Sequence, residues 1–149
     1  MNNPNAVEIL VVEDNPQDLE LTLRTFRQLK LSNRVHVARD GAEALGLIFG
    51  DVKGNPPINA PRVVVLDLKL PKVDGIEVLR RLKTDPRTHS IPVVVLTTSR
   101  EQRDQVESYK LGVNSYIVKP VNFERFADAV HQLGFHWLLH NQPPVHASA

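Results

Sequence analysis

The sequence has no cysteine among its 149 residues, so it can form neither disulfide bonds nor thiolate metal sites. Its formal net charge is only +1, which argues against an electrostatic nucleic-acid binder, since such proteins carry a basic stripe. No apolar run approaches the roughly 20 residues that a membrane-spanning helix needs. Residues 1–5 lack the basic and apolar segments of a secretion signal. We therefore expect a cytoplasmic protein with no nucleic-acid or membrane partner.

The residues that are present are typical of one globular domain. Hydrophobic residues make up 42% of the chain and charged residues 23%, an ordinary balance for such a domain. A chain of this length can bury about two thirds of its surface. We expect a disordered tail over residues 1–6, a folded domain over 7–140 and a flexible tail over 141–149.

Short apolar runs alternate with helical patterns along the domain, and an unbroken apolar run is typical of a strand buried on both faces. The expected strands are 7–12, 34–38, 63–66, 91–96 and 115–118, with 34–38 at a sheet edge. The expected helices cover about 16–30, a segment capped by Asp40, a segment from Gly75 to just before Asp85, about 101–111, and a segment from near Asn122. This alternation predicts a flavodoxin-like, doubly wound parallel sheet of five strands in the order 2-1-3-4-5, with five helices.

Polar residues stand directly at the ends of four of these strands. Glu13 and Asp14 follow the first strand, Asp67 the third, Thr97 the fourth and Lys119 the fifth. Because the carboxyl ends of parallel strands share one edge, these side chains should converge. Three carboxylates that repel one another imply a hard divalent cation, and Mg²⁺ fits such oxygen ligands. Lys119 suits a phosphate, and a carboxylate beside it can attack phosphorus.

Each of these residues also has an ordinary structural explanation. The acids could cap helices, the threonine could be a strand-end hydroxyl, and the lysine could be a solvated surface residue. Their joint placement at four strand ends favours a functional site over these separate explanations.

The same residues stand in motifs that resemble the receiver domain of two-component response regulators, over about residues 7–140. The motifs are Val12-Glu13-Asp14-Asn15, Leu66-Asp67-Leu68-Lys69-Leu70-Pro71 followed by Asp74-Gly75, Pro92-Val93-Val94-Val95-Leu96-Thr97, and Tyr116-Ile117-Val118-Lys119-Pro120. The resemblance implies that Asp67 is the phosphoacceptor and that a histidine kinase is the donor. It also implies a Mg²⁺ site formed by Glu13, Asp14, Asp67 and the main-chain carbonyl of Lys69.

The resemblance further implies how the phosphoryl group is bound and sensed. Thr97 and Lys119 would contact it, and Tyr116 would be the aromatic residue that changes rotamer. The signal would then pass to the face made by the fourth helix, the fifth strand and the fifth helix. In this family the peptide bond that matches Lys119–Pro120 is usually cis.

A narrower resemblance is to the stand-alone regulators paired with phytochrome-type histidine kinases. It rests on the long loop over residues 50–61 and on Thr97-Thr98-Ser99, Asn114-Ser115-Tyr116 and Trp137-Leu138-Leu139. Lys69 and Ser99 match variable positions of the family that affect phosphoryl lifetime.

Two other functions compete with that of a signalling receiver. One is a Mg²⁺-dependent phosphohydrolase with an aspartyl-phosphate intermediate, of the haloacid dehalogenase type. Such enzymes carry a second aspartate two residues after the nucleophile, and here that position holds Lys69. The other is an unphosphorylated scaffold, which would not need the complete set of acids, threonine and lysine. The sequence therefore favours a phosphoacceptor that signals through a partner and is not an enzyme in its own right.

Two surfaces are expected to bind other proteins. The end of the last helix, with Phe135, Trp137, Leu138 and Leu139, is apolar nearly all round and predicts a homodimer interface. Alternatively, the C-terminal tail could fold back and cover these side chains. Leu21, expected to be exposed on the first helix, resembles the position where a kinase docks, although a stray surface leucine is also common.

Overall fold

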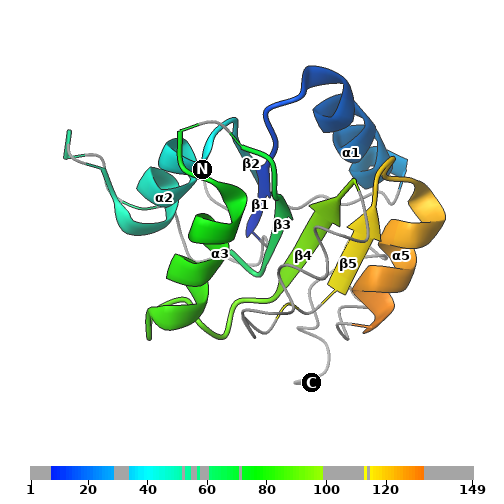
Figure 1. Cartoon of the computed structure of the whole chain (residues 1–149). Helices are drawn as coiled ribbons and strands as arrows, with labels where there is room; N and C mark the ends of the chain where they lie inside the picture. The colour runs from blue at the N-terminus through cyan, green and yellow to red at the C-terminus, as the bar shows by residue number, and fades with distance from the viewer. Residues whose placement is uncertain are drawn as a thin grey trace.

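The computed structural model describes residues 8–28, 34–51, 53–54, 57, 61–70, 72–98, 113 and 115–132. Five parallel strands form one sheet in the order β2-β1-β3-β4-β5 (Figure 1). They are β1 (Glu8–Val12), β2 (Arg34–Ala38), β3 (Val63–Asp67), β4 (Val93–Thr97) and β5 (Ser115–Val118). Their order and direction confirm the predicted flavodoxin-like sheet, with residues 34–38 at an edge.

Helices cover both faces of the sheet. Among the described residues, α1 (Pro16–Gln28) and α5 (Phe123–Gln132) lie on one face, and α2 (Gly41–Phe49) and α3 (Gly75–Thr84) on the other (Figure 1). The predicted cap of α2 is confirmed, because the Asp40 side chain accepts a hydrogen bond from the Glu43 amide at 2.7 Å. The helix expected over 101–111, both tails and the interface residues Phe135, Trp137, Leu138 and Leu139 lie outside the described residues.

The three inner strands bury apolar side chains on both faces, and successive side chains alternate between them. The face under α1 and α5 receives Ile9, Val11, Val63, Val65, Val94 and Leu96. The face under α2 and α3 receives Leu10, Val12, Val64, Leu66, Val93 and Val95. Because both faces of these strands are buried among apolar side chains, a polar side chain on them can reach water only at a strand end.

The fourth strand begins two residues later than its apolar run suggested. Val93 is its first residue, although Ile91 is also buried. Proline has no N–H to donate to a neighbouring strand, which explains the late start. Pro92 still contributes its carbonyl oxygen, which accepts a hydrogen bond from the Val64 amide at 3.0 Å.

The turn from β3 into α3 is fixed by the Asp74-Gly75 pair. The Asp74 carboxylate accepts a hydrogen bond from the Ile76 amide at 3.1 Å and caps α3. A β-carbon on Gly75 would lie 2.5 Å from the carbonyl oxygen of Asp67, so no larger residue fits without a backbone shift. The start of α3 therefore packs directly against the end of the strand that carries Asp67.

Candidate functional site

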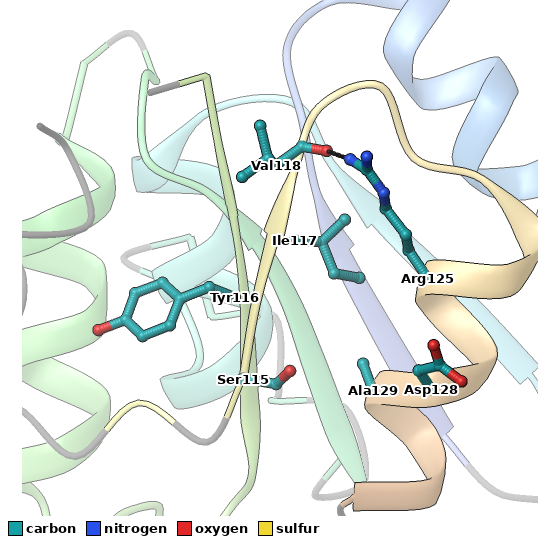
Figure 2. A pocket seen from close by; sticks show the side chains of 7 residues that line it. All are labelled: Ser115, Tyr116, Ile117, Val118, Arg125, Asp128 and Ala129. Carbon is teal, nitrogen blue, oxygen red and sulfur yellow. Dashed lines mark hydrogen bonds between the residues drawn. The ribbon is translucent and has the colours of Figure 1, made fainter. Parts of the chain in front are cut away.

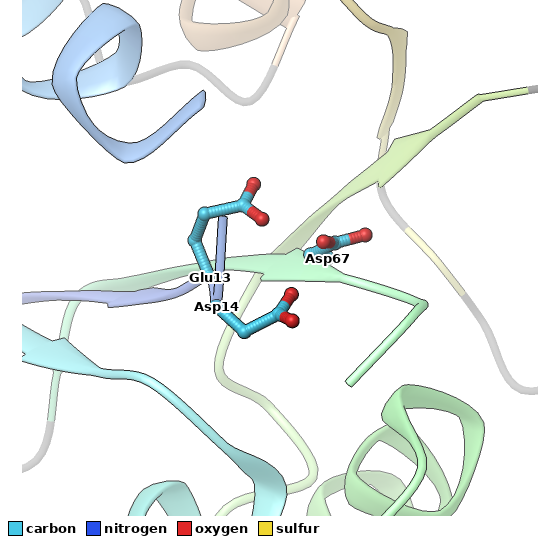
Figure 3. A group of neighbouring side chains, drawn as sticks. All are labelled: Glu13, Asp14 and Asp67. Carbon is cyan, nitrogen blue, oxygen red and sulfur yellow. The ribbon is translucent and has the colours of Figure 1, made fainter. Parts of the chain in front are cut away.

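Three carboxylates meet at the carboxyl ends of β1 and β3. One oxygen from each of Glu13, Asp14 and Asp67 lies within 4.8 Å of the other two. Figure 3 shows the Glu13 and Asp14 carboxylates on opposite sides of the β1 end, with Asp67 beside them. Glu13 and Asp67 are buried, whereas Asp14 is exposed. The predicted convergence of these three acids is therefore present in the structure.

Lys119 lies over the cluster from the end of β5. Its Nζ is 3.0 Å from Asp67 Oδ2 and 3.0 Å from Glu13 Oε1, and its side chain is only 11% exposed. The Lys119 amide also donates to the carbonyl oxygen of Thr97 at 2.8 Å, which ties the lysine to the end of β4. The Lys119–Pro120 peptide bond is cis, as the resemblance predicted.

Lys119 has a further partner that the sequence analysis missed. Asp18, in the first turn of α1, places its Oδ2 2.9 Å from Lys119 Nζ. The start of α1 is fixed by Asn15, whose side-chain oxygen accepts hydrogen bonds from the amides of Gln17 at 2.9 Å and Asp18 at 3.0 Å. The available signal was that Asp18 lies one helical turn after Asp14, in a helix that begins at this edge of the sheet.

The crowding of acids changes how the buried groups hold protons. Burial raises the pKa of Glu13 to about 8, the nearby Asp67 carboxylate adds to the rise, and Lys119 opposes it. Burial by itself lowers the pKa of Lys119, but hydrogen bonds to Asp18, Glu13 and Asp67 outweigh it and raise the pKa above its ordinary value. Lys119 is therefore a cation that pairs with the carboxylates of Glu13, Asp18 and Asp67, and Asp14 lies beside two of these acids.

Asp67 is oriented by contacts on both of its carboxylate oxygens. The Lys69 amide donates to Oδ1 at 3.1 Å, and Lys119 pairs with Oδ2 at 3.0 Å. Lys69 is exposed and lines the pocket over the site with Asp14, Asn15, Pro16, Asp18, Asp67, Thr98 and Lys119. The predicted metal contact of the Lys69 carbonyl stays a prediction.

The predicted switch residues lie next to the site. Thr97 is 1% exposed, and within the described part of the chain its hydroxyl has no hydrogen-bond partner. It is Thr98 that reaches the pocket. Tyr116 is half-buried, packs with the cluster under α2 and α3, and points away from α5, whereas Ile117 points toward it (Figure 2). Contact of Thr97 with a phosphoryl group and movement of Tyr116 stay predictions.

The acidic cluster fits a hard divalent cation. Carboxylate oxygens are the ligands that Mg²⁺ prefers. Glu13 Oε1 is fully buried and, among the described residues, accepts no hydrogen bond, although it lies 3.0 Å from Lys119 Nζ. A cation at Glu13, Asp14 and Asp67 would reduce the repulsion between these acids, which adds to the effect of burial on the pKa of Glu13.

Comparisons with known proteins identify the family of this chain. Residues 9–131 match the response regulator receiver domain. The chain belongs to the receiver-domain family. It is 43% identical over 136 residues to the probable methanogenesis regulatory protein FilR2 of Methanothrix harundinacea, spanning 91% of this chain and 86% of that protein. Its structure resembles that of the bacteriophytochrome response regulator AtBRR, with 53% identity, a TM-score of 0.81 and coverage of 89% of this chain and 95% of that chain.

A further similar structure is the Mn²⁺-bound form of response regulator Rcp1. It is 35% identical, with a TM-score of 0.70 and coverage of 91% of this chain and 95% of that chain. Receiver domains take a phosphoryl group from histidine kinases and bind Mg²⁺ or Mn²⁺ at an acidic site. In the described part of this chain, the helices are too short or too polar to cross a bilayer.

The predicted docking residue Leu21 lies on α1, the helix that also carries Asp18. We expected Leu21 to be exposed, but its side chain is half-buried. The difference follows from its position on the helix, because its neighbours Thr22 and Thr25 are buried and Leu21 lies at the border of that buried face. Its role in kinase docking stays a prediction.

Proposed function

We propose that this chain is a single-domain response regulator in which Asp67 accepts a phosphoryl group from the phosphohistidine of a histidine kinase. The observation that carries the proposal is the meeting of Asp67 with Glu13, Asp14 and Lys119 at one edge of the sheet. The similarity to AtBRR supports a phytochrome-type kinase as the donor. Leu21 on α1 is the proposed docking contact.

In the proposed transfer, an Asp67 carboxylate oxygen attacks phosphorus and forms an acyl phosphate. The phosphorus–nitrogen bond breaks, and its electron pair returns to the kinase imidazole. The amide of Lys69 and the ammonium of Lys119 orient the attacking carboxylate, and Lys119 then binds a phosphoryl oxygen. A Mg²⁺ ion held by Glu13, Asp14, Asp67 and the Lys69 carbonyl would supply further positive charge for the transferring group.

The proposed output begins at Thr97. Its hydroxyl would turn toward the phosphoryl group, and Tyr116 would move into the space that Thr97 leaves. The two residues lie on adjacent paired strands, since Thr97 is opposite Val118 and Val95 is opposite Tyr116. This movement would alter the face of β5 and α5, together with the helix expected over 101–111.

We further propose that the chain forms a homodimer through the apolar end of the last helix, at Phe135, Trp137, Leu138 and Leu139. The support is the sequence pattern alone, because these residues lie outside the described part of the chain. Light scattering at micromolar concentration tests the proposal. We expect a dimer that Leu138→Arg converts to a monomer, and a monomeric wild-type chain in both phosphorylation states would contradict it.

The function is tested by phosphotransfer from a phytochrome-type histidine kinase in the presence of Mg²⁺. We expect wild-type protein to be labelled and Asp67→Asn to remain unlabelled, because the substitution removes the nucleophile and almost nothing else. Asp74→Asn is the matched control, since Asp74 is an exposed helix cap seven residues away and asparagine also caps helices. Stoichiometric labelling of Asp67→Asn would refute the assignment. Turnover of a small phosphate ester would favour the phosphohydrolase instead.

A further inference from the structure

The ammonium group of Lys119 has three hydrogens, and each is already donated to a carboxylate. The acceptors are Glu13 Oε2 at 3.2 Å, Asp18 Oδ2 at 2.9 Å and Asp67 Oδ2 at 3.0 Å. In the proposed function, Lys119 must also donate to a phosphoryl oxygen. One of the three present acceptors therefore has to give up its hydrogen bond.

The three acceptors differ in how easily they can be released. The side chain of Glu13 is 0% exposed, that of Asp67 is 4% exposed and that of Asp18 is 28% exposed. A buried carboxylate without a partner is costly, whereas a carboxylate at the pocket mouth can be hydrated again. Asp67 also keeps its contact, because transfer to its Oδ1 leaves Oδ2 as a carbonyl oxygen that still accepts from Lys119. This leaves Asp18 as the partner that can leave.

We propose that Asp18 is a positioning residue that holds Lys119 in the unphosphorylated state and is replaced by a phosphoryl oxygen when Asp67 is phosphorylated. The inference rests on the proposed function. Asp18 lines the same pocket as Asp67 and Lys119 but is not one of the three clustered acids that would hold a cation. Its carboxylate therefore competes with the phosphoryl group for Lys119 and is not among the proposed ligands of the cation.

The direction in which removal of Asp18 changes phosphoryl binding separates this competition from a purely structural role. Asp18 stands in the first turn of α1, where an acid interacts favourably with the helix dipole. Its loss should therefore slightly lower thermal stability. A residue that only stabilises the fold would, when removed, weaken phosphoryl binding or leave it unchanged. A competitor would, when removed, strengthen it.

The probe for the test is beryllium fluoride in the presence of Mg²⁺, a mimic of the aspartyl phosphoryl group. Its dissociation constant is measured by fluorine NMR titration. We expect Asp18→Asn to bind about fivefold more tightly than wild type, at the low end of couplings between linked sites. Asp18→Glu keeps the negative charge and should bind like wild type. Glu20→Gln, which removes an exposed acid of the same helix that is paired with Arg27, should also bind like wild type.

Unchanged or weaker binding by Asp18→Asn would overturn the inference while leaving the proposed function intact. Equal tightening by Glu20→Gln would also overturn it, because the cause would then be net charge. Equally tight binding of beryllium fluoride by Asp18→Glu would also overturn the inference, because the negative charge at position 18 would then not be what competes for Lys119. If wild-type protein itself fails to bind beryllium fluoride, the proposed function fails and the inference fails with it.

Discussion

The middle of the sheet and its carboxyl edge are built from the same strands but bury opposite kinds of side chain. In the middle, residues such as Leu10 and Val65 are 0% exposed and surrounded by apolar neighbours. At the edge, Glu13 and Asp67 are almost equally buried but face other acids and Lys119. The middle lowers the free energy of the folded state, whereas the edge is a poor arrangement for stability and a suitable one for binding a cation and a phosphoryl group.

The largest expected effect on stability belongs to the middle of the sheet. Leu10→Ala should lower the free energy of unfolding by about 2–5 kcal/mol, because it removes buried apolar contacts and leaves a cavity. Urea denaturation measures this change. Mg²⁺ affinity, measured by calorimetry under folding conditions, should stay the same. If affinity falls together with stability, the two regions are not separable.

The second effect belongs to the carboxyl edge and depends on the metal. Mg²⁺ at about 100 times its dissociation constant should raise the free energy of unfolding by about 2.7 kcal/mol, since it binds the folded cluster. Asp14→Ala should remove most of this gain, whereas Asp74→Asn should keep it. The two variants are compared by thermal unfolding with and without Mg²⁺. Equal stabilisation of Asp14→Ala would place the cation elsewhere.

A third effect is a pH dependence that comes from Glu13. Its pKa rises from 4.5 to about 8 on folding, so the folded state holds this proton more tightly than the unfolded state. In metal-free protein, the contribution of Glu13 to stability is complete below pH 4.5 and is lost as the pH rises toward 8. Glu13→Gln should flatten this slope in denaturant titrations between the two pH values. The same slope in wild type and variant would contradict the effect.

The sequence predicted the parts of this molecule that depend on local patterns. Unbroken runs such as Val63–Leu66 predicted inner strands, since only an element buried on both faces tolerates them. The convergence of Asp67 and Lys119 followed from the strand order, which the alternation of elements predicted.

The parts that escaped prediction depend on contacts between distant segments. Asp18 meets Lys119 across 101 positions of sequence, and an acid in the first turn of a helix already has an ordinary explanation in the helix dipole. Thr97 is buried and Thr98 lines the pocket, because β4 continues through Thr97, one residue past its apolar run. Side-chain direction at a strand end cannot be derived from the alternation of apolar residues.

The contrast between the two regions is tested most directly by comparing wild type with Asp67→Asn. Two quantities are measured on the same preparations: the free energy of unfolding without Mg²⁺, and phosphoryl labelling. The substitution removes one acid from an excess of acids, keeps an oxygen for the Lys69 amide, and leaves Lys119 paired with Glu13 and Asp18. We predict that labelling is lost while the free energy of unfolding is unchanged or higher. A less stable Asp67→Asn protein that is still labelled would show that Asp67 serves the fold and not the transfer of a phosphoryl group.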